Sequence, residues 1–191
     1  SSFLGNYFNY LSSPFTVLIF LFDKADISFA ITALVIVKCM ASAVTFTYYL
    51  KASQKRHSYV SAAFGVFYAF CAYFLAYYWN IMWIDGMILL PLIVLGIEQL
   101  VHNGKGALYT GALAVLLLSN YYMGYMACIF SVLYFLAYFL MTAKPRPEKS
   151  GEKLTTREKY SAKNLMRHPF LNRCARFAGF SLLAGGLCAV T

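Results

Sequence analysis

The sequence YYWNIMWIDGMILLP, residues 77–91, separates two long apolar runs. This separation indicates the fold class of the chain. Such runs of about 20 residues recur along the chain, which is the length that a helix needs to cross a bilayer. The 191 residues are 61% hydrophobic and only 12% charged, whereas soluble domains carry roughly 25% charged residues. The sequence therefore predicts an all-α fold, a polytopic bundle of transmembrane helices.

The apolar runs predict about six spans, at residues 27–50, 59–79, 87–101, 107–120, 124–141 and 177–191. The run 14–22 is too short to span and predicts an interfacial or re-entrant helix. We read residues 1–191 as a single transmembrane domain. Its predicted parts are an outer loop with the short helix (1–26), five spans (27–141), a basic loop (142–176) and a truncated sixth span (177–191).

Two expectations concern the ends of this domain. Within the basic loop, a short helix is expected near residues 156–167, and Pro169 is expected to end it. The chain begins without Met and stops inside an apolar run, so we expect an N-proximal fragment of a longer protein.

The basic residues predict which ends of the spans face the cytoplasm. All but Lys24 and Lys38 of the 16 Lys and Arg residues fall in residues 51–58, 102–106 and 142–176. Short loops rich in Lys and Arg stay on the cytoplasmic side. We therefore expect these segments to be cytoplasmic, and residues 80–86 and 121–123 to be extracellular.

The net charge of +9 lies mostly in these loops. It predicts anionic lipid headgroups as the partners of residues 142–176, and no nucleic acid. The three histidines also fall in the predicted cytoplasmic loops and are interpreted as headgroup contacts.

Asp85 has two readings. It precedes Gly86 and an apolar run, which predicts a helix N-cap at the outer surface. The alternative is a site carboxylate at the mouth of a lipid-facing cavity, acting as a base, orienting a hydroxyl or holding a cation at a phosphate. Its neighbours Asn80, Trp79 and Trp83 fit either an interfacial aromatic belt or a platform for a sugar ring.

Two more clusters of Asn and Tyr are expected on the same side of the membrane. One contains Asn120, Tyr121 and Tyr122, and the other contains Asn6 and Tyr7. Each is compatible with a turn bearing interfacial tyrosines. Three such clusters on one face favour a shared substrate-binding pocket.

Lys38 lies in the middle of the first predicted span, where an unpaired ammonium costs at least a few kcal/mol. Counted from the predicted outer ends of their spans, Lys38 and Glu98 both lie roughly 17 Å deep. The sequence therefore predicts that they contact each other or share a water-filled cavity. The alternative is that Glu98 lies at the inner interface and Lys38 extends to an edge.

The sequence has no metal-ligand spacing and no phosphate-binding glycine loop. We therefore predict no resident cofactor and no protein-ligated metal. A divalent cation is compatible with a site that handles a phosphate.

Three stretches carry a resemblance to a known family: GNYFNYLSSPF (5–15), YYWNIMWIDGMILLPLIVLGIEQL (77–100) and LSNYYMGYMACIFSVLYFL (118–136). They resemble the YfhO family of bacterial membrane proteins. That family is similar to the C-type (GT-C) glycosyltransferases, which transfer a sugar from a polyprenyl-phosphate donor on the outer membrane face.

The resemblance implies a GT-C-like fold in the bacterial plasma membrane. It also implies glycosylation of lipoteichoic acid or another envelope polymer, with membrane lipid, a polyprenyl-phosphate sugar and an envelope acceptor as partners. C-type enzymes usually take their catalytic base from the first outer loop, which would precede residue 1 here. Asp85 is then the candidate catalytic residue within this chain, with a role nearer to substrate organisation than to base catalysis.

Two other functions remain open. A transporter or flippase of a lipid-linked substrate would also need charged groups within the membrane and short, interrupted helices. A non-catalytic scaffold for envelope assembly is the other alternative.

Overall fold

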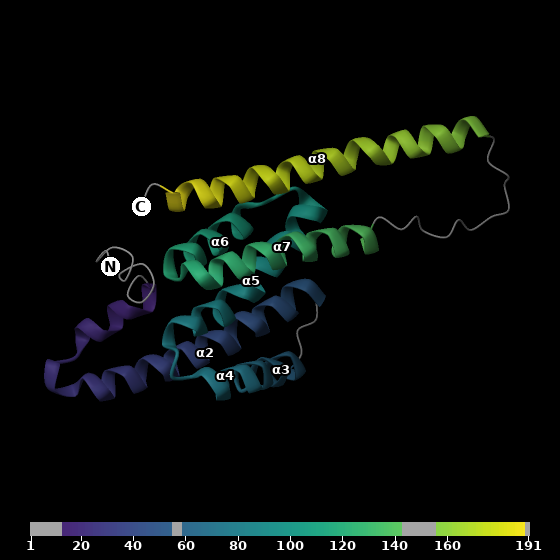
Figure 1. Cartoon of the computed structure of the whole chain (residues 1–191). Coiled ribbons are helices and arrows are strands. Elements are labelled where there is room, and N and C mark those ends of the chain that lie inside the picture. The colour runs from purple at the N-terminus through teal and green to yellow at the C-terminus, as the bar shows by residue number, and fades with distance from the viewer. Residues whose placement is uncertain (1–12, 55–58, 143–155, 190–191) are drawn as a thin grey trace.

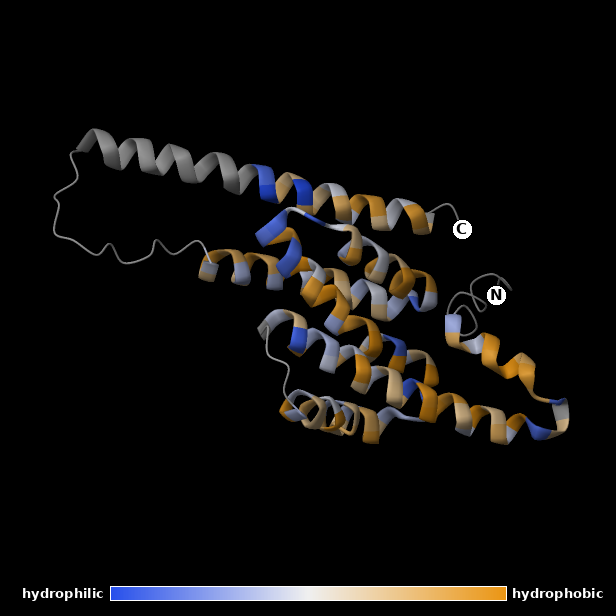
Figure 2. Ribbon diagram, turned by 180° about the vertical axis from the view of Figure 1, so that it is seen from behind, coloured by the Kyte–Doolittle hydropathy of each residue, from blue (hydrophilic) through white to orange (hydrophobic). Residues whose placement is uncertain are grey.

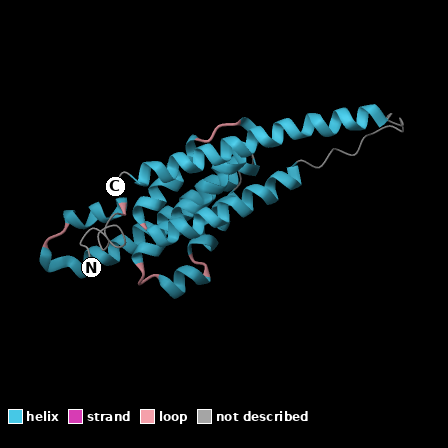
Figure 3. Ribbon diagram, turned by 45° about the horizontal axis from the view of Figure 1, so that its top comes forward, coloured by secondary structure: helices cyan, strands magenta, loops and turns pink. Residues whose placement is uncertain are grey.

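The computed structural model describes residues 13–54, 59–142 and 156–189, without the side chains of residues 24, 54, 156–171 and 189. Every regular element in these residues is helical (Figures 1 and 3), so the all-α prediction is confirmed. The 3-10 helices are η1 (Pro14–Leu21) and η2 (Lys24–Asp26). The α-helices are α2 (Ile27–Gln54), α3 (Tyr59–Ala69), α4 (Ala72–Tyr77), α5 (Ile81–Asn103), α6 (Ala107–Ser119), α7 (Tyr121–Thr142) and α8 (Thr156–Ala189).

Four segments are long and apolar enough to cross a membrane: α2, α3 together with α4, α5, and α7. Helix α6 is equally apolar but shorter. In an apolar stretch of 18 residues in α5, 61% of the residues are buried, against 22% in the corresponding stretch of α7. Helix α5 is therefore the central helix. Figure 1 shows α8 on one side of the group formed by α5, α6 and α7, and α2 to α4 on the other.

The outer surface of this bundle is apolar, as Figure 2 shows by its hydropathy colours. Large side chains such as Phe29, Phe67 and Leu133 are 66%, 73% and 62% exposed. A water-soluble fold would bury side chains of this kind. Their exposure on the long helices fits a surface that faces lipid.

The start of α5 differs from the prediction. Helix α5 begins at Ile81 rather than Met87, and its N-cap is Asn80. The predicted N-cap role of Asp85 is therefore wrong, and Asp85 lies within the first turns of the helix. The reason is that residues 81–84 are as apolar as the run that follows and contain no helix breaker, so the helix extends back to the polar Asn80.

Helix α8 replaces two predicted elements. A short helix at 156–167 and a separate span at 177–191 were expected, but one helix runs from Thr156 to Ala189 through Pro169. Proline removes only one backbone hydrogen bond, and strong helix formers occupy much of the segment before it. The predicted end at Pro169 is wrong. Residues 143–155 of the predicted basic loop lie outside the described residues.

Pro91 lies inside α5 and supplies no N–H to the carbonyl of Met87, four residues earlier. The hydroxyl of Tyr68 on α3 donates to this Met87 oxygen at 2.9 Å instead. The Tyr68 ring stacks on Phe46 of α2, with ring centroids 4.3 Å apart. The unpaired carbonyl that Pro91 leaves in α5 is therefore the place where α2, α3 and α5 contact each other through Tyr68.

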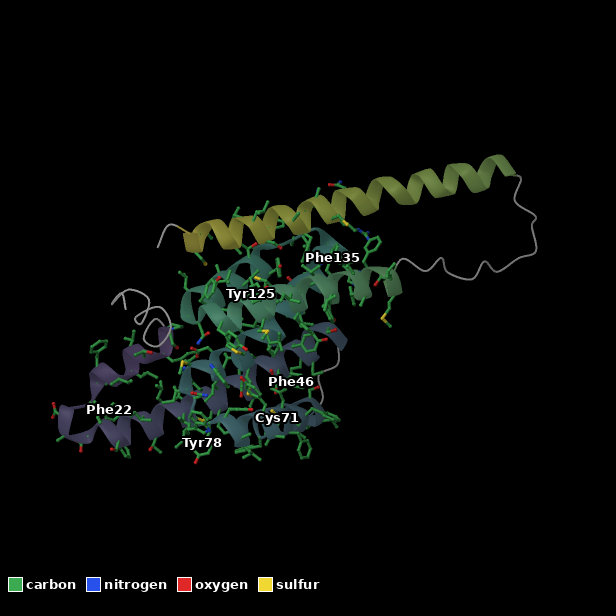
Figure 4. The ribbon with its side chains drawn as sticks, viewed as in Figure 1. Phe22, Phe46, Cys71, Tyr78, Tyr125 and Phe135 are labelled. Atoms are coloured by element: carbon green, nitrogen blue, oxygen red, sulfur yellow. The ribbon has the colours of Figure 1, made fainter. Side chains whose placement is uncertain are left out.

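Close approach between α5 and α6 depends on Gly96. A Cβ atom at this position would lie 2.5 Å from the backbone nitrogen of Tyr109. Small residues let membrane helices approach each other in this way. The main core lies beside this contact and extends to Phe135 of α7, labelled in Figure 4, which stacks on Phe177 of α8 at 4.4 Å.

Candidate functional site

A buried ion pair joins α2 to α5. The Lys38 Nζ lies 2.8 Å from Asp85 Oδ1 and donates to the Ile81 carbonyl at 2.9 Å. Both charged side chains are only 1% exposed. Asp85 Oδ1 is engaged by the ammonium, whereas Asp85 Oδ2 has no hydrogen-bond partner within the described residues. This oxygen is a buried acceptor.

The ring of Phe15 on η1 lies 5.7 Å from Lys38 Nζ. An aromatic face at this distance attracts a cation and excludes water from it. A buried charge without a partner strongly destabilises a fold, because the low-dielectric interior does not solvate it. Lys38 and Asp85 can therefore be buried only as a pair. The short helix η1 thus covers the ion pair on one side.

The predicted contact between Lys38 and Glu98 is wrong. Lys38 pairs with Asp85, and about 20 Å of helix separates Asp85 from Glu98. The depth estimate failed because it started from Met87 rather than from the true beginning of α5. Side chains on a helix extend toward its N-terminus, which for α2 is the predicted outer end. That direction would have favoured Asp85 as the partner.

Glu98 is instead held by hydroxyl groups. Its Oε1 accepts from Tyr49 at 3.0 Å and from Tyr134 at 2.9 Å, and its Oε2 accepts from Ser53 at 2.8 Å. The residue is 7% exposed. Sequence reasoning missed these donors. The available signal was their spacing, because Tyr49 and Ser53 are four residues apart and share one helix face.

A polar cavity of about 430 Å³ adjoins Glu98, and Gln99, Asn103 and Tyr138 also line it. His102, another lining residue, is hydrogen-bonded to the Tyr138 hydroxyl at 2.7 Å. The ends of α2 and α5 and the last part of α7 form this cavity. Glu98 is therefore buried near the ends of α2 and α5. The alternative position of Glu98 at the inner membrane interface stays a prediction.

Two of the three predicted aromatic clusters meet in the structure. The ring of Trp83 on α5 lies 5.3 Å from that of Tyr77 and 6.4 Å from that of Tyr122 on α7. Tyr73 extends the group, 5.3 Å from Tyr77. We call Tyr73, Tyr77, Trp83 and Tyr122 the aromatic cluster. Cys71 and Tyr78, labelled in Figure 4, flank α4, which carries two of these tyrosines.

The other predicted site residues are placed differently. Asn120 is buried and its side-chain oxygen accepts from the Met123 N–H at 2.9 Å, which caps α7. Trp79 is 65% exposed and donates to the Ala76 carbonyl. Tyr121 is 70% exposed, and the half-buried Asn80 serves as the N-cap of α5. Asn6 and Tyr7 lie outside the described residues.

An apolar cavity of about 360 Å³ opens between the helices beside the aromatic cluster. Its walls include Leu90, Leu116, Met126 and Phe130. Gly86, the neighbour of Asp85, and Tyr73 of the aromatic cluster also line it. The volume falls within the roughly 300–1,000 Å³ range of ligand pockets. Within the described residues, no group of three or more His, Cys, Asp or Glu side chains is placed to hold a metal ion.

The family model described as "Bacterial membrane protein YfhO" matches residues 2–191. The chain belongs to the YfhO family. A relative from Bacillus subtilis (strain 168), "Uncharacterized protein YfhO", is 35% identical over 72 residues. The match covers 38% of this chain and 8% of that relative, so the chain aligns with a small part of a much longer protein. No solved structure matches this chain.

Membership of the YfhO family agrees with the apolar helices, and the chain is a membrane protein. In this YfhO chain, the ion pair, the aromatic cluster and the apolar cavity each include residues from the first turns of α5, namely Asp85, Trp83 and Gly86. Together they supply a buried ion pair, stacking surfaces and an apolar groove. These groups suit an amphiphilic ligand that has a polar head and an apolar tail.

Proposed function

We propose that this chain forms part of a membrane glycosyltransferase similar to the C-type enzymes. The enzyme would transfer a sugar from a polyprenyl-phosphate donor to lipoteichoic acid or another envelope polymer, at the outer face of the bacterial plasma membrane. The observation that carries the proposal is the apolar cavity of about 360 Å³ next to the aromatic cluster, at the part of α5 that also carries Asp85 of the buried ion pair.

Each part of this region has a role in the proposal. The apolar cavity takes the first isoprene units of the donor, whose tail stays in the lipid. Trp83 and Tyr122 present aromatic faces to the sugar ring, and Lys38 favours the donor phosphate over a neutral group. Asp85 holds the Lys38 ammonium in place through the buried ion pair.

The proposal gives base catalysis to a different residue. Asp85 is 1% exposed and already bound to an ammonium, which makes it a poor acceptor for the proton of a large polymer hydroxyl. The base would come from an acidic residue outside these 191 residues. Asp85 is then a substrate-organising residue, and a divalent cation at the donor phosphate remains compatible with this arrangement.

The test uses the two tryptophans of the chain. Trp83→Ala, in the full-length protein in its native host, should reduce the sugar content of the envelope polymer by roughly tenfold or more, because it removes a stacking surface. Trp79→Ala is the matched control, since Trp79 is not a member of the aromatic cluster and is 65% exposed. Full glycosylation by Trp83→Ala at normal membrane levels would refute the proposal.

A transporter or flippase of a lipid-linked substrate is the second candidate. The observation in its favour is the polar cavity of about 430 Å³ around Glu98, roughly 20 Å of helix away from Asp85. Polar groups near both ends of α5 fit a substrate head that is handed across the bilayer. Translocation of a fluorescent prenyl-phosphate sugar by the full-length protein in vesicles, without sugar transfer, would decide for this candidate. A scaffold would do neither.

A further inference from the structure

We propose that a pocket between the α5–α6 turn and α8 binds the phosphate headgroup of an anionic phospholipid. The pocket has a volume of about 200 Å³ and lies at the other end of α5 from the ion pair. Its polar lining consists of His102, Asn103 and Gly104 at the end of α5, and of Asn172, Arg173 and Arg176 on α8. The inference is independent of the proposed glycosyl transfer.

The positive charge of this pocket favours an anionic ligand. Arg173 and Arg176 bring two guanidinium groups to it, and neither has a carboxylate within ion-pair distance in the described part of the chain. Glu98, the acidic residue of the neighbouring cavity, is already occupied by three hydroxyl donors. Guanidinium groups match the oxygens of a phosphate in charge and in geometry.

Both arginines are held against the bundle. The guanidinium of Arg173 lies 5.8 Å from the centre of the Phe139 ring. Arg176 packs against the α5–α6 turn, where a Cβ atom on Gly104 would collide with its Nη1. Gly104 adopts φ of 69°, which favours glycine, and ends α5. The Arg176 guanidinium therefore lies directly against the backbone of Gly104.

The carbonyl groups at the end of α5 explain part of this arrangement, because a helix C-terminus attracts a cation. They carry only about half a negative charge, whereas the two guanidinium groups carry two positive charges. An excess of positive charge remains, and amide and imidazole groups that can donate hydrogen bonds surround it. A bound monoanionic phosphate diester would neutralise most of this excess.

The pocket also lies at the depth of a lipid headgroup. Figure 2 shows the hydrophilic part of α8 beside the hydrophilic α5–α6 turn. Away from this end, α8 and the neighbouring helices become apolar. Farther along α8, Leu182, Leu183 and Leu187 are exposed. A phosphate held by the arginines would leave its acyl chains along this apolar surface. Free inorganic phosphate would gain nothing from it.

The test measures lipid binding by the purified full-length protein in neutral detergent. Phosphatidylglycerol should raise the melting temperature, and phosphatidylcholine should not. Arg173→Gln combined with Arg176→Gln should weaken phosphatidylglycerol binding by roughly tenfold or more. The control is Lys51→Gln combined with Lys105→Gln, which removes two exposed charges from the same end of the bundle and should retain binding.

Three outcomes would overturn the inference. These are unchanged binding by the double glutamine variant, an equal loss in the control, or equal stabilisation by inorganic phosphate, which would assign the pocket to a free anion. If the glutamine variant does not fold, Arg173→Lys with Arg176→Lys decides. This variant keeps both charges but loses the planar fork, so its binding should still weaken several-fold, and unchanged binding would refute the assignment.

Discussion

Lys38 and Asp85 show what a single pair of residues does in this bundle. Removing one partner leaves the other charge buried, which costs about 3–5 kcal/mol. We therefore expect Lys38→Met and Asp85→Asn each to lower the free energy of unfolding by about that amount. The double variant contains no buried charge at this position and should be more stable than either single variant. Unfolding in detergent by denaturant titration would measure all three.

The same variants separate stability from function. The proposed transfer needs both groups, so the double variant should remain folded but fail to glycosylate the envelope polymer. Additive losses of stability in the double variant would show that the two side chains do not stabilise each other. Normal glycosylation by a stable double variant would remove both residues from the proposed site.

At this scale the sequence predicted the need for a partner but not its identity. A lysine in the middle of an apolar span must be paired, and that part of the prediction is confirmed by the ion pair. The choice between Asp85 and Glu98 depended on where α5 begins, which a uniformly apolar segment does not mark. The hydroxyl groups around Glu98 come from α2 and α7, two helices other than its own, so local sequence could not bring them to Glu98.

Among the elements, α5 depends on a neighbouring helix to complete its backbone. Tyr68→Phe removes the hydrogen bond from the Tyr68 hydroxyl to the Met87 carbonyl, and should cost about 1–3 kcal/mol. Pro91→Ala restores the missing N–H donor within α5. Tyr68→Phe should therefore cost much less in the Pro91→Ala background, and a double-mutant cycle of unfolding free energies would measure this coupling.

Tyr125→Phe is the control for this cycle. Tyr125 is 56% exposed, so the loss of its hydroxyl should change stability by no more than a few tenths of a kcal/mol. An equal cost of Tyr68→Phe in both backgrounds would show that the hydroxyl does not compensate for Pro91.

Element boundaries show where sequence patterns stop being informative. The long apolar runs identified α2, α5 and α7 because a bilayer demands length and hydrophobicity from each helix. The patterns did not find the interruption between α3 and α4 at residues 70–71, or the passage of α8 through Pro169. In a helical bundle, contacts with neighbouring helices decide such details, as Tyr68 does at Pro91.

For the whole molecule, orientation in the membrane is the property on which the proposed function depends. The distribution of Lys and Arg predicts that the α5–α6 turn is cytoplasmic and the α6–α7 turn is extracellular. In the full-length protein without other cysteines, Tyr121→Cys should react with a membrane-impermeant maleimide in intact cells. Lys105→Cys should react only after the membrane is permeabilised.

The reverse labelling pattern would place the aromatic cluster on the cytoplasmic side, where an outer-face transfer cannot occur. Both positions are exposed in the structure, so poor accessibility within the protein would not explain a missing signal. The cysteine-free parent protein, without either introduced cysteine, gives the background labelling.

The buried lysine of α2 also constrains how the chain is made. Lys38 leaves the ribosome before its partner, and the Ile81 carbonyl that it binds lies 43 residues later in the sequence. Until α5 is synthesised, α2 carries an ammonium that disfavours release into lipid by about 2.5–3.5 kcal/mol. We therefore expect α2 to stay longer beside the translocation channel than a helix of the same length without a lysine, and to enter the bilayer more readily once α5 is present.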